Sequence, residues 1–252
     1  MPNLPMHIYL ANQVAEQLDR SYVFDHLGSF YLGSTAPDIR AMTKKPRELT
    51  HFAPLSVAEV GTGTRTMFQT HPELKEAMSP ASQAFLAGYI CHLAADEIWI
   101  TSVFRPHFDT SVAETRLTDN DVEANIWDRA MQLDMDRQTL PQLNGDSHPK
   151  DLLACSDQDV SMPFFEEGLL TEWKDRVGRF VVWDFTWDRL KSALNRLYRD
   201  DEEVQHTVER FLDGMPGTLE KVCESVPEGE VTAYQERALA ATIAQVQEFI
   251  PK

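Results

Sequence analysis

The chain has few cysteines and no long apolar run. Its three cysteines, Cys91, Cys155 and Cys223, are too few and odd in number for the disulfide framework of a small secreted domain. No apolar run approaches the roughly 18–20 residues of a membrane-spanning helix. The first ten residues, MPNLPMHIYL, lack the basic and apolar regions of a secretory signal. These absences predict a soluble, cytoplasmic protein.

Positive charge is also scarce. Forty acidic residues face 23 lysines and arginines, so the formal net charge is −17. A field of this sign repels nucleic-acid phosphates and anionic lipid head groups, and charge-driven binding to either is therefore not expected. The remaining composition, 42% hydrophobic and 25% charged, is that of an ordinary globular protein.

Helical periodicity dominates the sequence, and strand-like alternation is almost absent. The longest apolar helical pattern, at residues 81–104, follows a Ser79-Pro80 start signal. The sequence therefore predicts an all-α fold, a single multi-helical domain over residues 1–252 with long irregular loops. The other predicted helices cover residues 8–19, 120–138, 171–198 (as one or two helices), 203–213 and 229–249.

Two stretches rich in glycine and proline interrupt the helical pattern. Residues 28–54 include Gly28 and Gly33, and residues 139–165 include Asn144-Gly145 and three prolines. A loop as long as the second is unusual inside a compact domain. We expect it to be either a functional lid or the boundary between two helical subdomains.

One predicted helix carries two potential metal ligands in an apolar setting. His92 and Asp96 are four residues apart and so share a helix face. This spacing alone indicates nothing, because eight histidines give roughly one such pair by chance. The apolar surroundings are more informative, since a buried carboxylate needs a partner, and zinc accepts both histidine and carboxylate ligands. Gly88, one turn earlier, allows close approach of another backbone or an ion. The alternatives are a simple Asp96–His92 pair or a contact between Asp96 and an arginine elsewhere.

Three further residues join this candidate site. Asp38 follows Pro37, whose fixed φ suits a rigid turn that presents a ligand, although an aspartate here is also a common helix N-cap. His51 lies in the irregular stretch before Pro54, and His7 opens the first helix. Each histidine is equally explained as an ordinary loop or helix-start residue.

Taken in order, these segments resemble the zinc-dependent phospholipase C family. The resemblance depends on His7 at the start of the first helix, Ala36-Pro37-Asp38, Thr50-His51-Phe52 and the FLAGYICHLAAD segment at 85–96. The family includes the catalytic domain of the glycosylphosphatidylinositol-specific phospholipase D and is related in fold to the S1/P1 nucleases. The resemblance covers roughly residues 1–105. It implies an all-α fold that holds up to three zinc ions and hydrolyses phosphoesters.

The resemblance also implies which side chains bind the metal: His7, Asp38, His51, His92 and Asp96. Asp38 matches the carboxylate that bridges two metals and orients the attacking water. Zinc lowers the pKa of its bound water to about 7, so zinc-bound hydroxide would attack phosphorus at neutral pH.

The chain departs from the three-metal members of the family. Those members have another histidine about ten residues after the helix histidine, where this chain has Thr101 and Ser102, and a later His-x-x-x-Glu pair that this chain lacks. We therefore expect one or two zinc ions, with His107 as an additional candidate ligand. Arg40, close to Asp38 in the sequence, is a candidate contact for a substrate phosphate.

Three functions remain open from the sequence. The first is a zinc-dependent phosphoester hydrolase that acts on a lipid or on a small soluble phosphoester. The second is a non-catalytic acidic helical binding or scaffold protein that keeps a partial metal site. The third is a nuclease similar to the S1/P1 group, against which the charge argues, because proteins that bind single strands use a basic groove.

Overall fold

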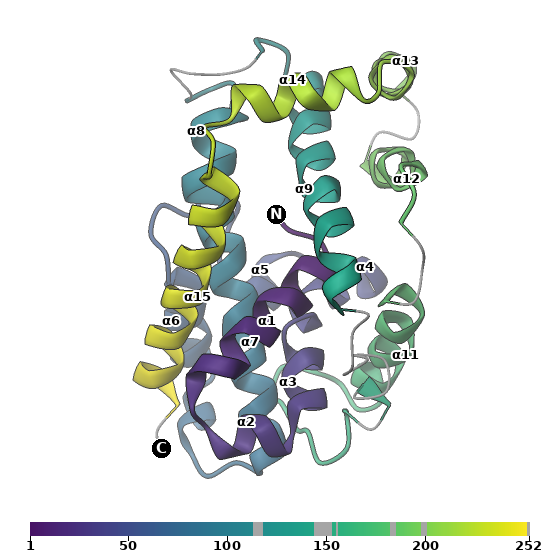
Figure 1. The fold of residues 1–252 in the computed structure, drawn as a ribbon. Helices are drawn as coiled ribbons and strands as arrows, with labels where there is room; N and C mark the ends of the chain where they lie inside the picture. The colour runs from purple at the N-terminus through teal and green to yellow at the C-terminus, as the bar shows by residue number, and fades with distance from the viewer. Residues whose placement is uncertain (113–117, 144–152, 155, 182–184, 198–200, 251–252) are drawn as a thin grey trace.

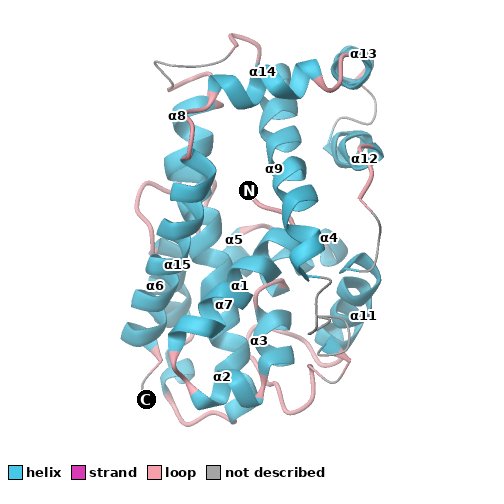
Figure 2. Cartoon of the chain, viewed as in Figure 1, coloured by secondary structure: helices cyan, strands magenta, loops and turns pink. Residues whose placement is uncertain are grey.

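The computed structural model describes the chain except residues 113–117, 144–152, 155, 182–184, 198–200 and 251–252. Within the described residues every regular element is a helix, which confirms the all-α prediction (Figure 2). The longer helices are α1 (Leu4–Leu18), α6 (Thr62–Thr70), α7 (Pro80–Ile98), α9 (Asp121–Leu143), α11 (Leu169–Val181), α12 (Asp188–Leu197), α13 (Glu202–Asp213), α14 (Gly217–Ser225) and α15 (Glu230–Phe249). The shorter ones are α2 (Ser21–Asp25), α3 (Leu27–Gly33), η1 (Ala36–Ile39), α4 (Arg40–Thr43), α5 (Glu48–His51), η2 (Pro72–Lys75), the π-helical η3 (Trp99–Phe104) and α8 (Arg105–His107). None of these helices is long and apolar enough to cross a membrane.

Helix α7 is the central element, and α1, α2, α3 and α15 pack around it (Figure 1). It begins as the start signal predicts: the Ser79 hydroxyl accepts a hydrogen bond from the Ser82 amide at 3.1 Å, and Pro80 occupies the first turn. Every residue from Ala84 to Ile98 is buried. A helix that is buried on all sides has no polar face, which explains its continuous apolar pattern.

Two glycines set the distance between α3 and α7. A Cβ atom at Gly33 would lie 2.0 Å from the Phe85 carbonyl oxygen, and one at Gly88 would lie 2.0 Å from that of Phe30. The group that approaches Gly88 is therefore the backbone of α3. The sequence had left open whether this group is another backbone or an ion. Residues 28–54, expected to be irregular, form the succession α3, η1, α4 and α5. Glycine in α3 allows the close contact with α7, and it does not interrupt helix α3.

Helix α9 packs against α1 and also contacts α12, α13 and α14 (Figure 1). It confirms the predicted acidic helix but extends through Pro141 to Leu143, so the start of the expected loop at 139–165 is helical. Residues 144–152 and 155 of that loop lie outside the described residues, and its role as lid or boundary stays a prediction. Helices α11 and α12 occupy the predicted 171–198 region, and half-buried Phe185 and Trp187 lie between them.

Candidate metal centre

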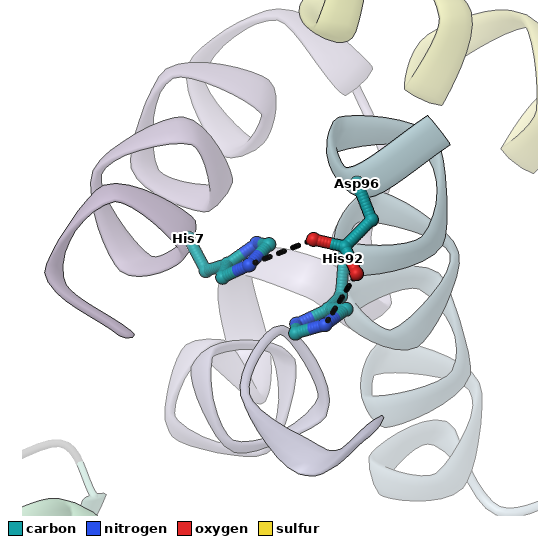
Figure 3. A group of neighbouring side chains, drawn as sticks. All are labelled: His7, His92 and Asp96. Atoms are coloured by element: carbon teal, nitrogen blue, oxygen red, sulfur yellow. Dashed lines mark ion pairs between the residues drawn. The ribbon is translucent and has the colours of Figure 1, made fainter. Parts of the chain in front are cut away.

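Three potential ligands from two helices meet in the core. Figure 3 shows His7 of α1 facing His92 and Asp96 of α7. The His7 Nε2 atom lies 3.5 Å from Asp96 Oδ1, and the His92 Nε2 atom lies 3.7 Å from Asp96 Oδ2. The two imidazole rings stack with their centroids 3.7 Å apart. All three side chains are at most 1% exposed.

The short elements after α3 add two more ligands. His51, at the end of α5, places its Nε2 atom 3.3 Å from His92 Nε2 and 3.3 Å from Asp96 Oδ2. Asp38 of η1 places its Oδ1 atom 3.8 Å from the same nitrogen. These separations are close to the edge of a zinc tetrahedron, about 3.4 Å for bonds of about 2.1 Å. Two sets of three side chains are thereby placed to hold a cation: His7, His92 and Asp96, and Asp38, His51 and His92.

Hydrogen bonds on the outer ring nitrogens orient two of the histidines. The His92 Nδ1 atom is 2.8 Å from the Ser34 carbonyl oxygen. A carbonyl only accepts, so Nδ1 carries the proton and Nε2 presents a lone pair to the centre. The His51 Nδ1 atom pairs with the Thr50 hydroxyl at 3.0 Å, a group that can accept its proton. Outer partners of this kind are typical of metal-binding histidines.

Several atoms at the centre are buried without a hydrogen-bond partner. They are both ring nitrogens of His7 and the Oδ1 atom of Asp96. Buried polar groups without partners are costly and rare in native proteins. A cation between the His7 and Asp96 side chains would satisfy His7 Nε2 and Asp96 Oδ1, and the mixed nitrogen and oxygen donor set suits zinc. The residues present therefore fit a metal ion.

The protonation states favour metal binding as well. Burial lowers the pKa of His92 well below its usual value, and the neighbouring His7 lowers it further. Burial also lowers the pKa of His51. Burial by itself would raise the pKa of Asp96, but His92 and the Arg47 guanidinium outweigh it and hold that pKa well below its usual value. His51 and His92 thus offer neutral imidazoles and Asp96 an ionised carboxylate, the forms that bind a metal.

Sequence reasoning missed Arg47. Its Nη2 atom donates to Asp96 Oδ2 at 2.9 Å, and the arginine is only 7% exposed. The contact between Asp96 and an arginine, left open above, thus exists together with the histidine contacts. The spacing carried a signal: Arg47 precedes His51 by four residues, and the His51 amide bonds to its carbonyl at 2.7 Å. One helical turn therefore aims both side chains at Asp96.

Glu97 is a second residue that the motifs did not reveal. Its carboxylate accepts hydrogen bonds from the amides of Gly61 and Gly63, at 2.5 and 2.6 Å, where α6 begins. Burial raises its pKa. A Cβ atom at Gly63 would lie 2.5 Å from the His51 carbonyl oxygen. Glu97 therefore fixes the segment against which the backbone of His51 packs.

The two sides of the centre differ in their access to solvent. The Asp38 side chain is 31% exposed, whereas that of Asp96 is 2% exposed. The contacts of Asp96 reach His7, His51 and His92, while those of Asp38 reach His51. The bridging role predicted for Asp38 stays a prediction. Arg40 begins α4, two residues after Asp38.

The positions that relate to a third metal ion are Thr101, Ser102 and His107, and none of them belongs to the candidate centre. The hydroxyls of Thr101 and Ser102 each donate to a backbone carbonyl one turn earlier, at 2.7 Å. His107 is in α8, where its ring packs edge-on against Phe108, and burial lowers its pKa against the attraction of Glu230. Neither set of candidate ligands includes His107. Its role as a ligand stays a prediction without geometric support.

The fold and the centre define a class: an all-helical protein with a buried histidine and carboxylate site suited to zinc. A family model described as zinc-dependent phospholipase C matches residues 6–177, about two thirds of the chain, and the protein belongs to this family. The match extends well past the expected limit near residue 105. No curated protein and no solved structure matches the chain. At family level, membership and the two candidate ligand sets support a metal-dependent phosphoesterase with a metal cofactor.

Proposed function

We propose that the protein is a zinc-dependent hydrolase of phosphoesters that uses the centre formed by His7, Asp38, His51, His92 and Asp96. The observation that carries this proposal is the approach of His51 Nε2, His92 Nε2 and Asp96 Oδ2 to within 3.3–3.7 Å of one another in a buried site. Zinc held there would supply an activated water and neutralise a phosphate. The family's phospholipase activity supports a lipid or a small phosphoester as substrate.

The buried and the solvent-exposed residues of the centre have different roles. The buried ligands, His7, His51, His92 and Asp96, hold the metal, and hydrogen bonds on the outer ring nitrogens of His51 and His92 orient these two rings toward it. Asp38, the ligand with access to solvent, orients the attacking water and accepts its proton on a carboxylate oxygen. The net charge of −17 favours substrates whose groups beyond the phosphate are neutral or cationic.

A non-catalytic binding protein is the competing function, and the Arg47–Asp96 ion pair is the observation that favours it. An arginine that pairs with a ligand carboxylate compensates part of the negative charge of that carboxylate without a metal. Such a protein would retain the ion-pair network and show no hydrolysis.

The first test measures zinc per chain by mass spectrometry, on protein purified without a tag or chelator. We expect one or two zinc ions in the wild type and in the control His206→Ala, which changes an exposed histidine on α13. The His92→Ala variant should lose zinc, and Asp38→Asn should lose at least about 100-fold in hydrolysis of a phosphodiester panel, the range of general-base effects.

The panel includes short-chain phosphatidylcholine and bis(p-nitrophenyl) phosphate. Absence of zinc from the wild type, even after zinc is added, would contradict the proposal. Zinc binding without hydrolysis of any panel member would favour the binding protein.

A further inference from the structure

The Arg47 side chain is the strongest feature that the metal centre leaves unexplained. It is a buried cation with one hydrogen bond to a side chain, from Nη2 to Asp96. Its Nε and Nη1 atoms are also buried and have no hydrogen-bond partner. A guanidinium has five N–H donors, and leaving buried donors unpaired is costly. A partner rich in oxygen acceptors is therefore missing at Arg47.

The charges at the centre indicate what this partner is. With a metal bound, the carboxylates of Asp38 and Asp96 contribute two negative charges and Arg47 contributes one positive charge, because histidines bind a metal as neutral imidazoles. One zinc ion makes this group net positive, and a second makes it more so. In a chain of net charge −17, the loaded centre is a local positive site. A phosphate group, with one or two negative charges and several acceptor oxygens, complements it.

Arg47 also supplies positive charge in a chain that departs from the three-metal pattern. Thr101 and Ser102, which stand where those family members have a histidine, donate their hydroxyls to the helix backbone. A fixed guanidinium can stabilise charge on a phosphate oxygen much as a metal does. It remains charged at any working pH.

We propose that Arg47 binds the phosphate of the substrate through Nη1 while Nη2 keeps Asp96 in place. This inference rests on the proposed function for the identity of the substrate, but the binding of phosphate itself does not require turnover. It assigns to Arg47 the substrate contact that the sequence suggested for Arg40.

The experiment titrates zinc-loaded protein with inorganic phosphate in a calorimeter and measures zinc content on the same samples. Arg47→Gln removes the charge, Arg47→Lys keeps it, and Arg65→Gln is the control because Arg65 is an exposed arginine of α6 paired with Glu59. We expect Arg47→Gln to weaken phosphate binding at least tenfold. Arg47→Lys should recover part of the loss, and Arg65→Gln should bind phosphate like the wild type.

The outcomes separate the two proposals. Unchanged phosphate affinity in zinc-loaded Arg47→Gln overturns the role of Arg47 and leaves the hydrolase proposal intact. If Arg47→Gln does not retain zinc, Arg47→Lys decides: wild-type phosphate affinity in that zinc-loaded variant overturns the direct contact through Nη1, and a loss supports it. A wild type that binds phosphate through Arg47 but hydrolyses no phosphoester contradicts only the proposed function.

Discussion

Asp96 shows how much of the site a single residue can organise. An ionised carboxylate in the middle of a buried helix is strongly unfavourable by itself. Here Arg47 and His51 lie 2.9 and 3.3 Å from Oδ2, while Oδ1 faces His7 at 3.5 Å. These groups come from two segments of the chain, α1 and the turn of α5, and Asp96 itself lies on α7. The carboxylate therefore ties α1, α5 and α7 together at the point where the metal is expected.

Asp136 on α9 leads to a prediction about the pH dependence of stability. It is 1% exposed, and its Oδ2 atom accepts a hydrogen bond from Asn3 at 2.9 Å, beside the start of α1. Burial raises its pKa to about 7, against the effects of Asn3 and Arg189. In the unfolded chain an aspartate ionises near pH 3.9. Between about pH 4 and pH 7 the unfolded chain releases this proton and the folded chain keeps it, so stability falls as the pH rises.

We expect Asp136→Asn to remove this slope. The wild type should lose a few kcal/mol of unfolding free energy across the window, at about 1.4 kcal/mol for each pH unit between the two pKa values. Urea unfolding of metal-free protein at pH 5, 6, 7 and 8 measures it. Asp25→Asn, at an exposed aspartate of α2, is the control and should follow the wild type. Parallel profiles for the wild type and Asp136→Asn would contradict this account.

At the level of residues, the sequence predicted most of the candidate centre. His7, Asp38, His51, His92 and Asp96 belong to recognisable motifs, and the structure brings them together. Arg47 and Glu97 were missed, because their functions depend on contacts between segments. The four-residue spacing places Arg47 and His51 on one helical turn, but it does not show that Arg47 reaches a carboxylate 49 positions away.

The contact between α3 and α7 determines whether His92 is correctly oriented. An added Cβ at Gly88 would lie 2.0 Å from the Phe30 carbonyl oxygen and 2.9 Å from the Ser34 amide. Helix α3 would have to move away, and with it the Ser34 carbonyl that holds His92 Nδ1. We expect Gly88→Ala to destabilise the fold by about 1–3 kcal/mol or more, the usual range for overpacking, and to weaken zinc binding.

Thermal unfolding and zinc titration of the same protein measure both effects. Gly178→Ala, in α11, is the matched control because a Cβ there meets nothing within 4 Å. It should be neutral or stabilise by up to about 1 kcal/mol, since alanine suits a helix better than glycine. Wild-type stability and zinc affinity in Gly88→Ala would show that α3 and α7 can separate without affecting the site.

The long and the short helices differ in how they are stabilised. Long amphipathic or apolar helices, such as α1, α7, α9 and α15, follow from periodicity because their own sequences specify a buried face. The short elements α3, η1, α4 and α5 do not, since α3 carries two glycines and the others have only four residues each. Their helical form depends on tertiary packing, of α3 and η1 against α7 and of α4 and α5 against η1. A local sequence pattern does not encode such packing.

At the scale of the whole molecule, the family match ends at residue 177 but the core does not. The main cluster of buried apolar residues continues to Ile250. In α15, the Tyr234 ring meets Trp99 edge-on at 5.1 Å, and Gln245 accepts a hydrogen bond from Thr64 at 2.5 Å. Helix α15 therefore packs on a side of α7 that the residues matched by the family model do not cover.

A paired substitution within α15 tests this role. Ala238 is 1% exposed in the core, whereas Ala240, two residues later, is exposed. We expect Ala238→Glu to destabilise the protein by more than about 3 kcal/mol, because it forces a charge into the packed interior or displaces the helix. Ala240→Glu should stay within about 0.5 kcal/mol of the wild type. Urea unfolding measures the stability, and zinc content shows whether the damage reaches the centre. Similar midpoints for the two variants would mean that α15 lies loosely on the fold, and the residues of the family match would then have to stabilise the metal centre without it.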